Sequence, residues 1–166
     1  SSLENEITNS LYKIIGERLT QEDIEGFNEN IFETPIRDGK IENYNGQIID
    51  KMPDLTFRIK NRGKNVGISN KIYDGIFIEC KPVDAKHTIG SKYCADGLIR
   101  FVNGDYAWTM PCGMILAYAK ANYKKPQDLK KFLNDKKYQT ISNIKLISEK
   151  NNHGEAVFQS NHERIF

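Results

Sequence analysis

The chain has 166 residues, of which 39% are hydrophobic and 28% are charged. This length and composition indicate one soluble globular domain over residues 1–166, with enough apolar side chains for a core. No apolar run approaches the about 18 residues of a membrane span, and the first six residues lack the pattern of a signal peptide.

Charge and cysteine content narrow the class of protein further. The formal net charge of +2 is too small to indicate nucleic-acid binding by itself. The three cysteines are an odd number without paired spacing, which predicts reduced thiols and a cytoplasmic location. The three histidines show no zinc-ligand spacing, so a structural zinc site is not expected.

The first half of the chain predicts one helix followed by strands. Residues 3–19 carry apolar side chains at helical spacing, with Leu3, Ile7, Leu11 and Ile14 on one stripe. Strands are expected around residues 31–36, at 54–60 and at 72–81. Because proline has no amide donor, we expect Pro82 to end the third of these strands.

The second half predicts helices before two late strands. A helix is expected over residues 89–102, ended by Asn103-Gly104. Residues 106–119 are rich in aromatic side chains and methionine, and we expect Trp108 and Met110 to belong to the core. Further elements are expected at 126–137 (helix), 144–147 (strand) and 156–158 (strand). The order predicts an α/β fold, a mixed central sheet flanked by helices.

Five segments of the chain fit the pattern acid–any residue–lysine, and one of them ends a predicted buried strand. That segment is Glu79-Cys80-Lys81. Residues two apart in a strand point to one face, so Glu79 and Lys81 project together, and a neighbouring strand that begins at Asp54 can add a second carboxylate. Two carboxylates and a lysine suit a hard metal ion and an activated water. The alternative is a structural ion pair between Glu79 and Lys81 at the sheet rim.

These residues resemble the PD-(D/E)xK nuclease superfamily, whose motif is matched by Pro53-Asp54 and Glu79-Cys80-Lys81. The motif covers a handful of positions, and the expected element order agrees over roughly residues 3–148. The resemblance implies a restriction-endonuclease-like core of αβββαβ order. It also implies a Mg²⁺- or Mn²⁺-dependent nuclease in which Asp54 and Glu79 bind the metal and Lys81 assists attack on the phosphate.

Two further metal ligands are candidates. The carbonyl of Cys80 lies between the two motif residues and could supply an oxygen. Glu4 falls inside the apolar stripe of the first helix, whereas Glu6 and Glu17 fall off it. Many members of the resembled family use a glutamate from a helix as a ligand. The alternative for Glu4 is a frayed, solvated helix end.

Candidate nucleic-acid contacts lie outside the metal site. Lys86, His87 and Lys92 follow the motif strand, and Tyr93 and Arg100 share one helix face. His162 and Arg164 alternate with Ser160 as on one strand face. The alternative for each basic cluster is a solvated surface, and for Arg100 it is an ion pair with Asp96. The alternative for His162 and Arg164 is a solvated tail.

From these residues and the resemblance we expect a magnesium-dependent nuclease that acts on DNA rather than RNA. Roles in restriction, phage defence or repair are compatible with this expectation. The nuclease would act alone, as a homodimer or with a partner subunit, and no membrane is involved. A catalytically inactive nucleic-acid-binding module of the same fold is the alternative, and an interaction protein with a fortuitous acid–lysine pair is a second one.

Overall fold

The computed structural model describes residues 2–60, 71–119, 133, 146–151, 158–164 and 166. The chain divides into two compact units, residues 1–80 with 105–116 and residues 81–104 with 117–166. Both contain helical and extended segments, so the α/β class is confirmed. The single domain predicted for residues 1–166 stays a prediction.

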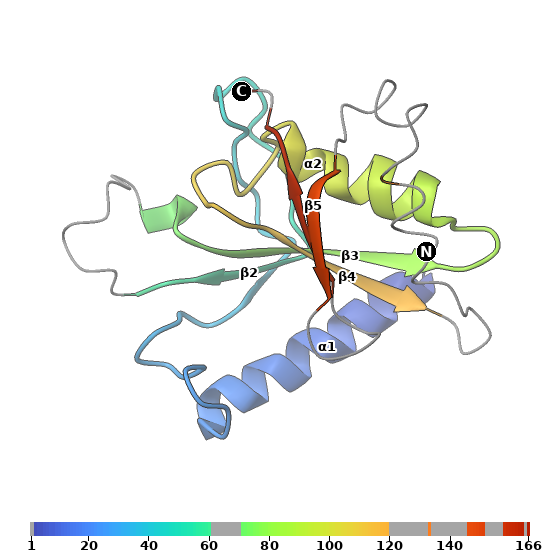
Figure 1. Cartoon of the computed structure of the whole chain (residues 1–166). Coiled ribbons are helices and arrows are strands. Elements are labelled where there is room, and N and C mark those ends of the chain that lie inside the picture. Colours follow the sequence, from blue (N-terminus) through green and yellow to red (C-terminus); the bar gives the residue numbers. More distant parts are fainter. Residues whose placement is uncertain (1, 61–70, 120–132, 134–145, 152–157, 165) are drawn as a thin grey trace. The chain divides into compact units, whose positions relative to one another are not determined.

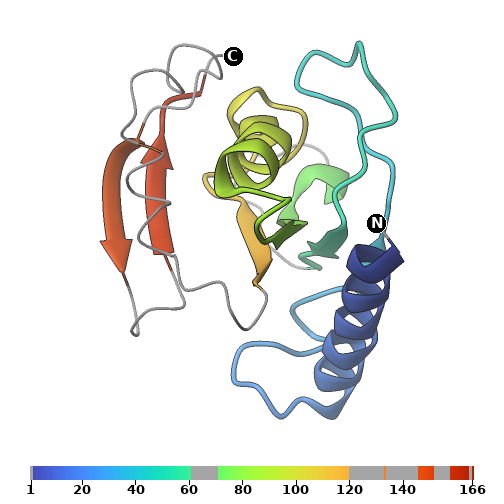
Figure 2. The same cartoon turned by 90° about the vertical axis from the view of Figure 1, so that its right-hand side faces the viewer.

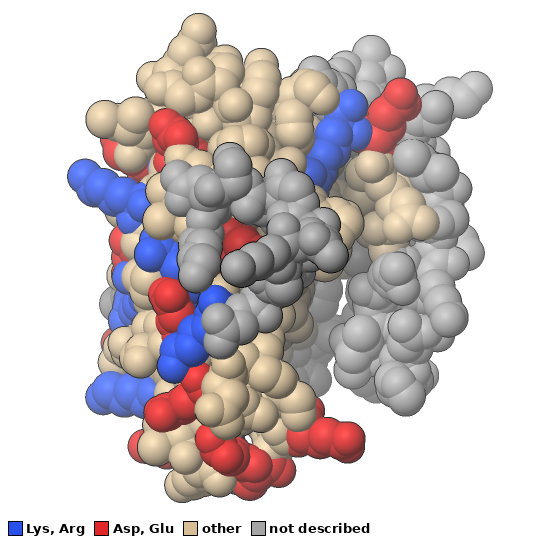
Figure 3. Space-filling model, turned by 90° about the vertical axis from the view of Figure 1, so that its left-hand side faces the viewer, with Lys and Arg blue, Asp and Glu red and all other residues tan. Residues whose placement is uncertain are grey.

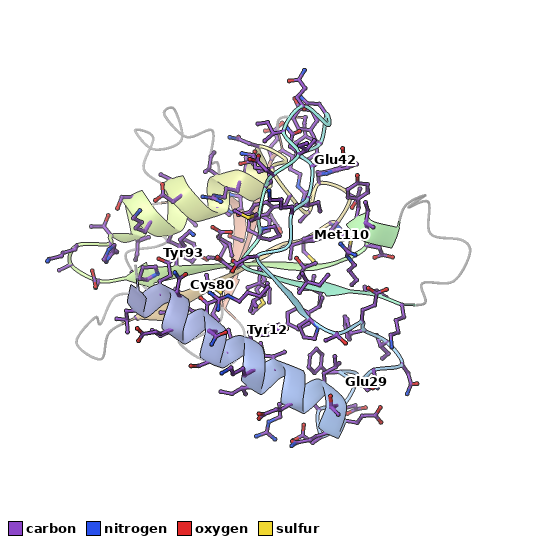
Figure 4. All side chains as sticks on the ribbon, turned by 180° about the vertical axis from the view of Figure 1, so that it is seen from behind. Tyr12, Glu29, Glu42, Cys80, Tyr93 and Met110 are labelled. Atoms are coloured by element: carbon purple, nitrogen blue, oxygen red, sulfur yellow. The ribbon has the colours of Figure 1, made fainter. Side chains whose placement is uncertain are left out.

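The first unit begins with the expected long helix, α1 (Ser2–Gln21). Its inward face is rotated from the predicted stripe, because Thr8 and Leu19 are buried whereas Ile14 is 52% exposed. Tyr12 is half-buried on the side of α1 that faces the strands (Figure 4). The predicted apolar stripe was therefore wrong about Ile14 and about Leu3, which is 50% exposed, and a threonine and a tyrosine share the inward face.

Four strands form one sheet in the order β1-β2-β3-β4 (Figure 1). They are β1 (Ile36–Arg37), β2 (Leu55–Arg58), β3 (Gly75–Val83) and β4 (Met114–Ala119). The pairs β1–β2 and β2–β3 are antiparallel. Asn9 of α1 accepts a hydrogen bond of 2.9 Å from the Arg37 guanidinium, which joins the helix to β1.

Strand β3 differs from its prediction at both ends. Ile72 belongs to a short 3₁₀ turn, η1 (Lys71–Tyr73), and the strand starts at Gly75. A Cβ atom at Gly75 would lie 2.5 Å from the Phe57 carbonyl oxygen, so only glycine fits where the two strands meet. The expectation that Pro82 ends the strand was wrong, since β3 continues to Val83. A proline is tolerated in a strand where no amide donor is required.

The core of the first unit forms around β2 and β3. Leu55, Phe57 and Phe77 are buried, as the apolar runs predict. Phe27 extends this cluster, with its ring centroid 5.8 Å from that of Phe57. Met110 is buried, which confirms its place in the core, and the half-buried Trp108 packs against Tyr73.

The second unit contains the predicted helix 89–102. It starts as a π-helix, η2 (Ile89–Leu98), and continues as α2 (Ile99–Val102). Thr88 caps the start by accepting a bond from the Ser91 amide, and the end at Asn103 is followed by Gly104 at φ 72°. The predicted stop at Asn103-Gly104 is confirmed.

The late strands β5 (Leu146–Asn151) and β6 (Phe158–His162) pair antiparallel (Figure 2). Both extend further along the chain than the strands predicted at 144–147 and 156–158. The predicted helix 126–137 lies outside the described residues except for Leu133, which is helical and buried. Within the described part of the chain, no helix combines the length and apolarity needed to cross a bilayer.

Candidate metal centre

The pairing of β2 with β3 brings two carboxylates to one face of the sheet. Leu55 pairs with Ile78 and Thr56 with Phe77. Continuing this register by one residue places Asp54 opposite Glu79. Directly opposed residues of antiparallel strands project to the same face, with Cβ atoms about 4.5–5.5 Å apart. A one-residue shift in register would have sent the two acids to opposite faces.

The Asp54 side chain is fixed at this position by the backbone of β3. Its Oδ2 accepts a hydrogen bond of 2.6 Å from the Cys80 amide. Its own carbonyl accepts one of 3.2 Å from the Asp38 amide, and the preceding Pro53 is fully buried. The half-buried Asp54 carboxylate is therefore joined to the strand that carries Glu79.

Glu79 is 1% exposed, and the hydroxyl of the fully buried Tyr106 donates to its Oε2. Burying a carboxylate costs free energy unless donors replace the lost water, and Tyr106 provides such a donor. Beside it, Asp105 forms a salt bridge of 2.9 Å with Lys51. Tyr106 was not among the predicted site residues. The sequence signals only that a buried acid needs a hydrogen-bond donor. It does not show which of the eight tyrosines supplies that donor.

Lys81 follows Glu79 on the same face of the continuous strand β3, because side chains alternate along a strand. Lys81 is buried, at 8% exposed. Cys80 is fully buried between them, with its thiol on the other face and free of any disulfide. The amide of Cys80 is used by Asp54, whereas a metal-binding role for its carbonyl stays a prediction.

Glu4 is half-buried and lies one turn before the buried Thr8 on the inward face of α1. Glu6 and Glu17 are exposed, as expected. Among the described residues, no three His, Cys, Asp or Glu side chains gather closely enough to hold a metal ion. A metal ligand at Glu4 therefore stays a prediction without support from the structure.

The remaining predicted contacts with nucleic acid belong to the second unit, and their role stays a prediction. Lys86 is exposed, and the His87 ring lies 3.0 Å from the Asp84 carboxylate. The Lys92 ammonium is 2.6 Å from the Asp96 carboxylate, so Asp96 forms an ion pair with the residue one turn before it. Arg100 is half-buried.

Tyr93, His162 and Arg164 complete the set of predicted nucleic-acid contacts. Burial raises the pKa of Tyr93 to about 12, so its hydroxyl stays protonated near neutral pH. His162 is bonded to Ser160 at 2.8 Å, which confirms that these two alternating residues share a strand face. Arg164 lies 5.6 Å from the centre of the Phe166 ring.

Charges of both signs are interspersed on the described part of the face in Figure 3. Acidic side chains gather at its lower end, where α1 finishes and the next loop begins. The exposed acids of this region are Glu17, Glu22, Asp23, Glu25 and Glu29. This end of the first unit is unsuited to a polyanion.

Comparison of the chain with protein-family models, with curated proteins and with solved structures finds no match.

Proposed function

We propose that the protein is a magnesium-dependent nuclease with a restriction-endonuclease-like core. The observation that supports the proposal most is that the register of β2 and β3 places Asp54, just before β2, opposite Glu79 within β3. The described elements α1, β1, β2, β3, α2 and β4 follow one another in the αβββαβ order that the resemblance implies.

The residues at this site fit magnesium. The ion prefers oxygen ligands, keeps several waters, and is commonly held by one or two carboxylates together with substrate phosphate. Asp54 and Glu79 supply two carboxylates, and their fixed backbone and hydroxyl partners orient them. When bound, magnesium supplies Lewis acidity toward a phosphate oxygen and lowers the pKa of water. Manganese would suit the same ligands.

The chain's own residues then have distinct tasks. Asp54 and Glu79 hold negative charge on one face of the sheet. The Lys81 ammonium, next on that face of β3, stabilises negative charge that develops on the phosphate during attack by water. Hydrolysis adds water across one phosphodiester bond and leaves one end with a phosphate and the other with a hydroxyl. DNA is the proposed substrate, and the three free cysteines suit a reducing compartment such as the cytoplasm.

One observation favours a second candidate, an inactive nucleic-acid-binding module of the same fold. Among the described residues only two acids, not three, come together, and one of them is already bonded to Tyr106. Such a module would bind DNA without magnesium and would cut nothing.

Incubation with supercoiled plasmid, single-stranded DNA and RNA separates the two candidates. Each substrate is combined with magnesium, manganese or a chelator, and binding is measured beside cleavage. We expect plasmid cleavage with either metal and none with chelator. Metal-independent binding without cleavage would support the inactive module, and the absence of both would refute nucleic acid as the substrate.

A further inference from the structure

A closed loop precedes the proposed metal centre in the chain. Ile41 and Lys51 exchange two backbone hydrogen bonds of 2.8 and 3.0 Å, which close residues 41–51 into a hairpin. Inside it, the Asn43 side chain accepts from the Ile48 amide at 3.0 Å, and Gly46 takes the positive φ of 69° that the turn needs. We call residues 41–52 the apolar loop. Figure 4 labels Glu42 at its start.

Four large apolar side chains of the apolar loop are exposed. Tyr44 is 43% exposed, Ile48 41%, Ile49 71% and Met52 47%. Single exposed apolar residues are ordinary, whereas several of them within one hairpin are typical of a surface that contacts another molecule. The four side chains offer roughly half of the about 800 Å² that one partner contributes to a stable protein interface. A smaller apolar target therefore fits the loop better.

The loop is attached beside the proposed metal centre. Lys51 at its end forms the salt bridge with Asp105, which precedes the Tyr106 that holds Glu79. Asp54 follows Ile49 by five positions, so their Cα atoms are at most about 17 Å apart. At about 3.4 Å per base pair, this distance corresponds to roughly five steps of a duplex. Bases within about five steps of the cleaved bond therefore lie in the same range of distances from Asp54 as Ile49.

We propose that Ile48 and Ile49 insert between stacked bases of bound duplex DNA, within about five steps of the cleaved bond. The inference rests on the proposed nuclease function. Apolar side chains are the groups that wedge between base steps, whereas phosphates require cations. The exposed charged residue beside the two isoleucines is the acid Asp50, so within residues 48–50 the apolar side chains are the groups suited to contact DNA. Insertion opens the stack and holds the strand in place for hydrolysis.

The test uses a duplex that the wild-type protein cuts, with 2-aminopurine placed in turn at each of about five steps on either side of the mapped cleavage site. Binding is measured in the Glu79→Gln background, which prevents cleavage. We expect fluorescence to rise several-fold at one step, because unstacked 2-aminopurine is bright. With Ile48→Ser and Ile49→Ser added, we expect the rise to disappear.

Cleavage provides the second readout. The Ile48→Ser/Ile49→Ser protein should cut the intact duplex about tenfold more slowly, and a mismatch at the reporter step should restore most of the rate, since the stack is already open. Ile24→Ser is the matched control: Ile24 is 49% exposed but lies in the acidic region around residues 17–29, and its loss should change neither readout.

Several outcomes would overturn the inference while leaving the nuclease intact. These are cutting by the wild type without a fluorescence rise at any step, an equal rise in the serine variant, or cutting restricted to single strands. Loss of a dimer in the serine variant with unchanged fluorescence would assign the loop to self-association instead. A wild-type protein that neither binds nor cuts the duplex would refute the proposed function itself.

Discussion

Replacing Tyr106 by phenylalanine tests how Glu79 is held. The substitution keeps the buried ring and removes the hydroxyl that donates to the Glu79 carboxylate. A hydrogen bond to a charged group contributes about 1.5–3 kcal/mol, so the free energy of unfolding should fall by that amount. Because the bond also orients a metal ligand, the magnesium concentration for half-maximal cleavage should rise about 10–100-fold. Chemical denaturation and magnesium titration of plasmid cleavage measure the two effects.

Tyr73→Phe is the matched control. Tyr73 also donates its hydroxyl to a glutamate, Glu42, in the same unit. Its loss should leave the magnesium requirement unchanged. In the Glu79→Gln background the acceptor is neutral, and removal of the Tyr106 hydroxyl should cost only about 0.5–1.5 kcal/mol of stability. An unchanged magnesium requirement in Tyr106→Phe, or an equal rise in Tyr73→Phe, would refute the role of Tyr106.

Three further outcomes are expected. If α1 supplies a metal ligand, Glu4→Gln should raise the magnesium concentration needed for cleavage, whereas Glu6→Gln should not. Equal magnesium titrations of the two variants would show that the site contains only Asp54 and Glu79. In the native protein a thiol reagent should label the exposed Cys112 at once and the two buried cysteines only on unfolding, and rapid labelling of all three would contradict their burial. The raised pKa of Tyr93, about 12 against an ordinary 10.0, stabilises the fold below pH 10 and loses this effect as pH rises toward 12. Tyr93→Phe should therefore flatten the fall in stability over that range, and an unchanged slope would argue against burial of the hydroxyl.

Local sequence patterns predicted the elements that carry the candidate site. The apolar runs at β2 and β3 and the stop at Asn103-Gly104 depend on neighbouring residues, so they were readable from the chain. The register that opposes Asp54 and Glu79 could not be predicted from alternating hydropathy, because Leu55, Thr56 and Phe57 are all buried and both faces of β2 are covered.

Features that depend on tertiary contacts could not be predicted from local sequence patterns. The inward face of α1 includes Thr8, whose burial is decided by what packs against it and not by its hydropathy. Strand β4 lies in a segment where Pro111 and Gly113 obscure the pattern. The bond between Tyr106 and Glu79 joins residues 27 positions apart, and no local spacing signals it.

Plasmid cleavage by Asp54→Asn and Glu79→Gln tests the central claim, that these two acids together form the catalytic metal site. Both substitutions keep the side-chain size and one acceptor oxygen and remove one negative charge. Glu6→Gln and Glu17→Gln, at exposed acids of α1, are matched controls outside the site. We expect each site variant to lose cleavage, the double variant to be little worse than either single one, and the controls to cut normally. Near wild-type cleavage by Glu79→Gln, with the fold intact, would contradict the account.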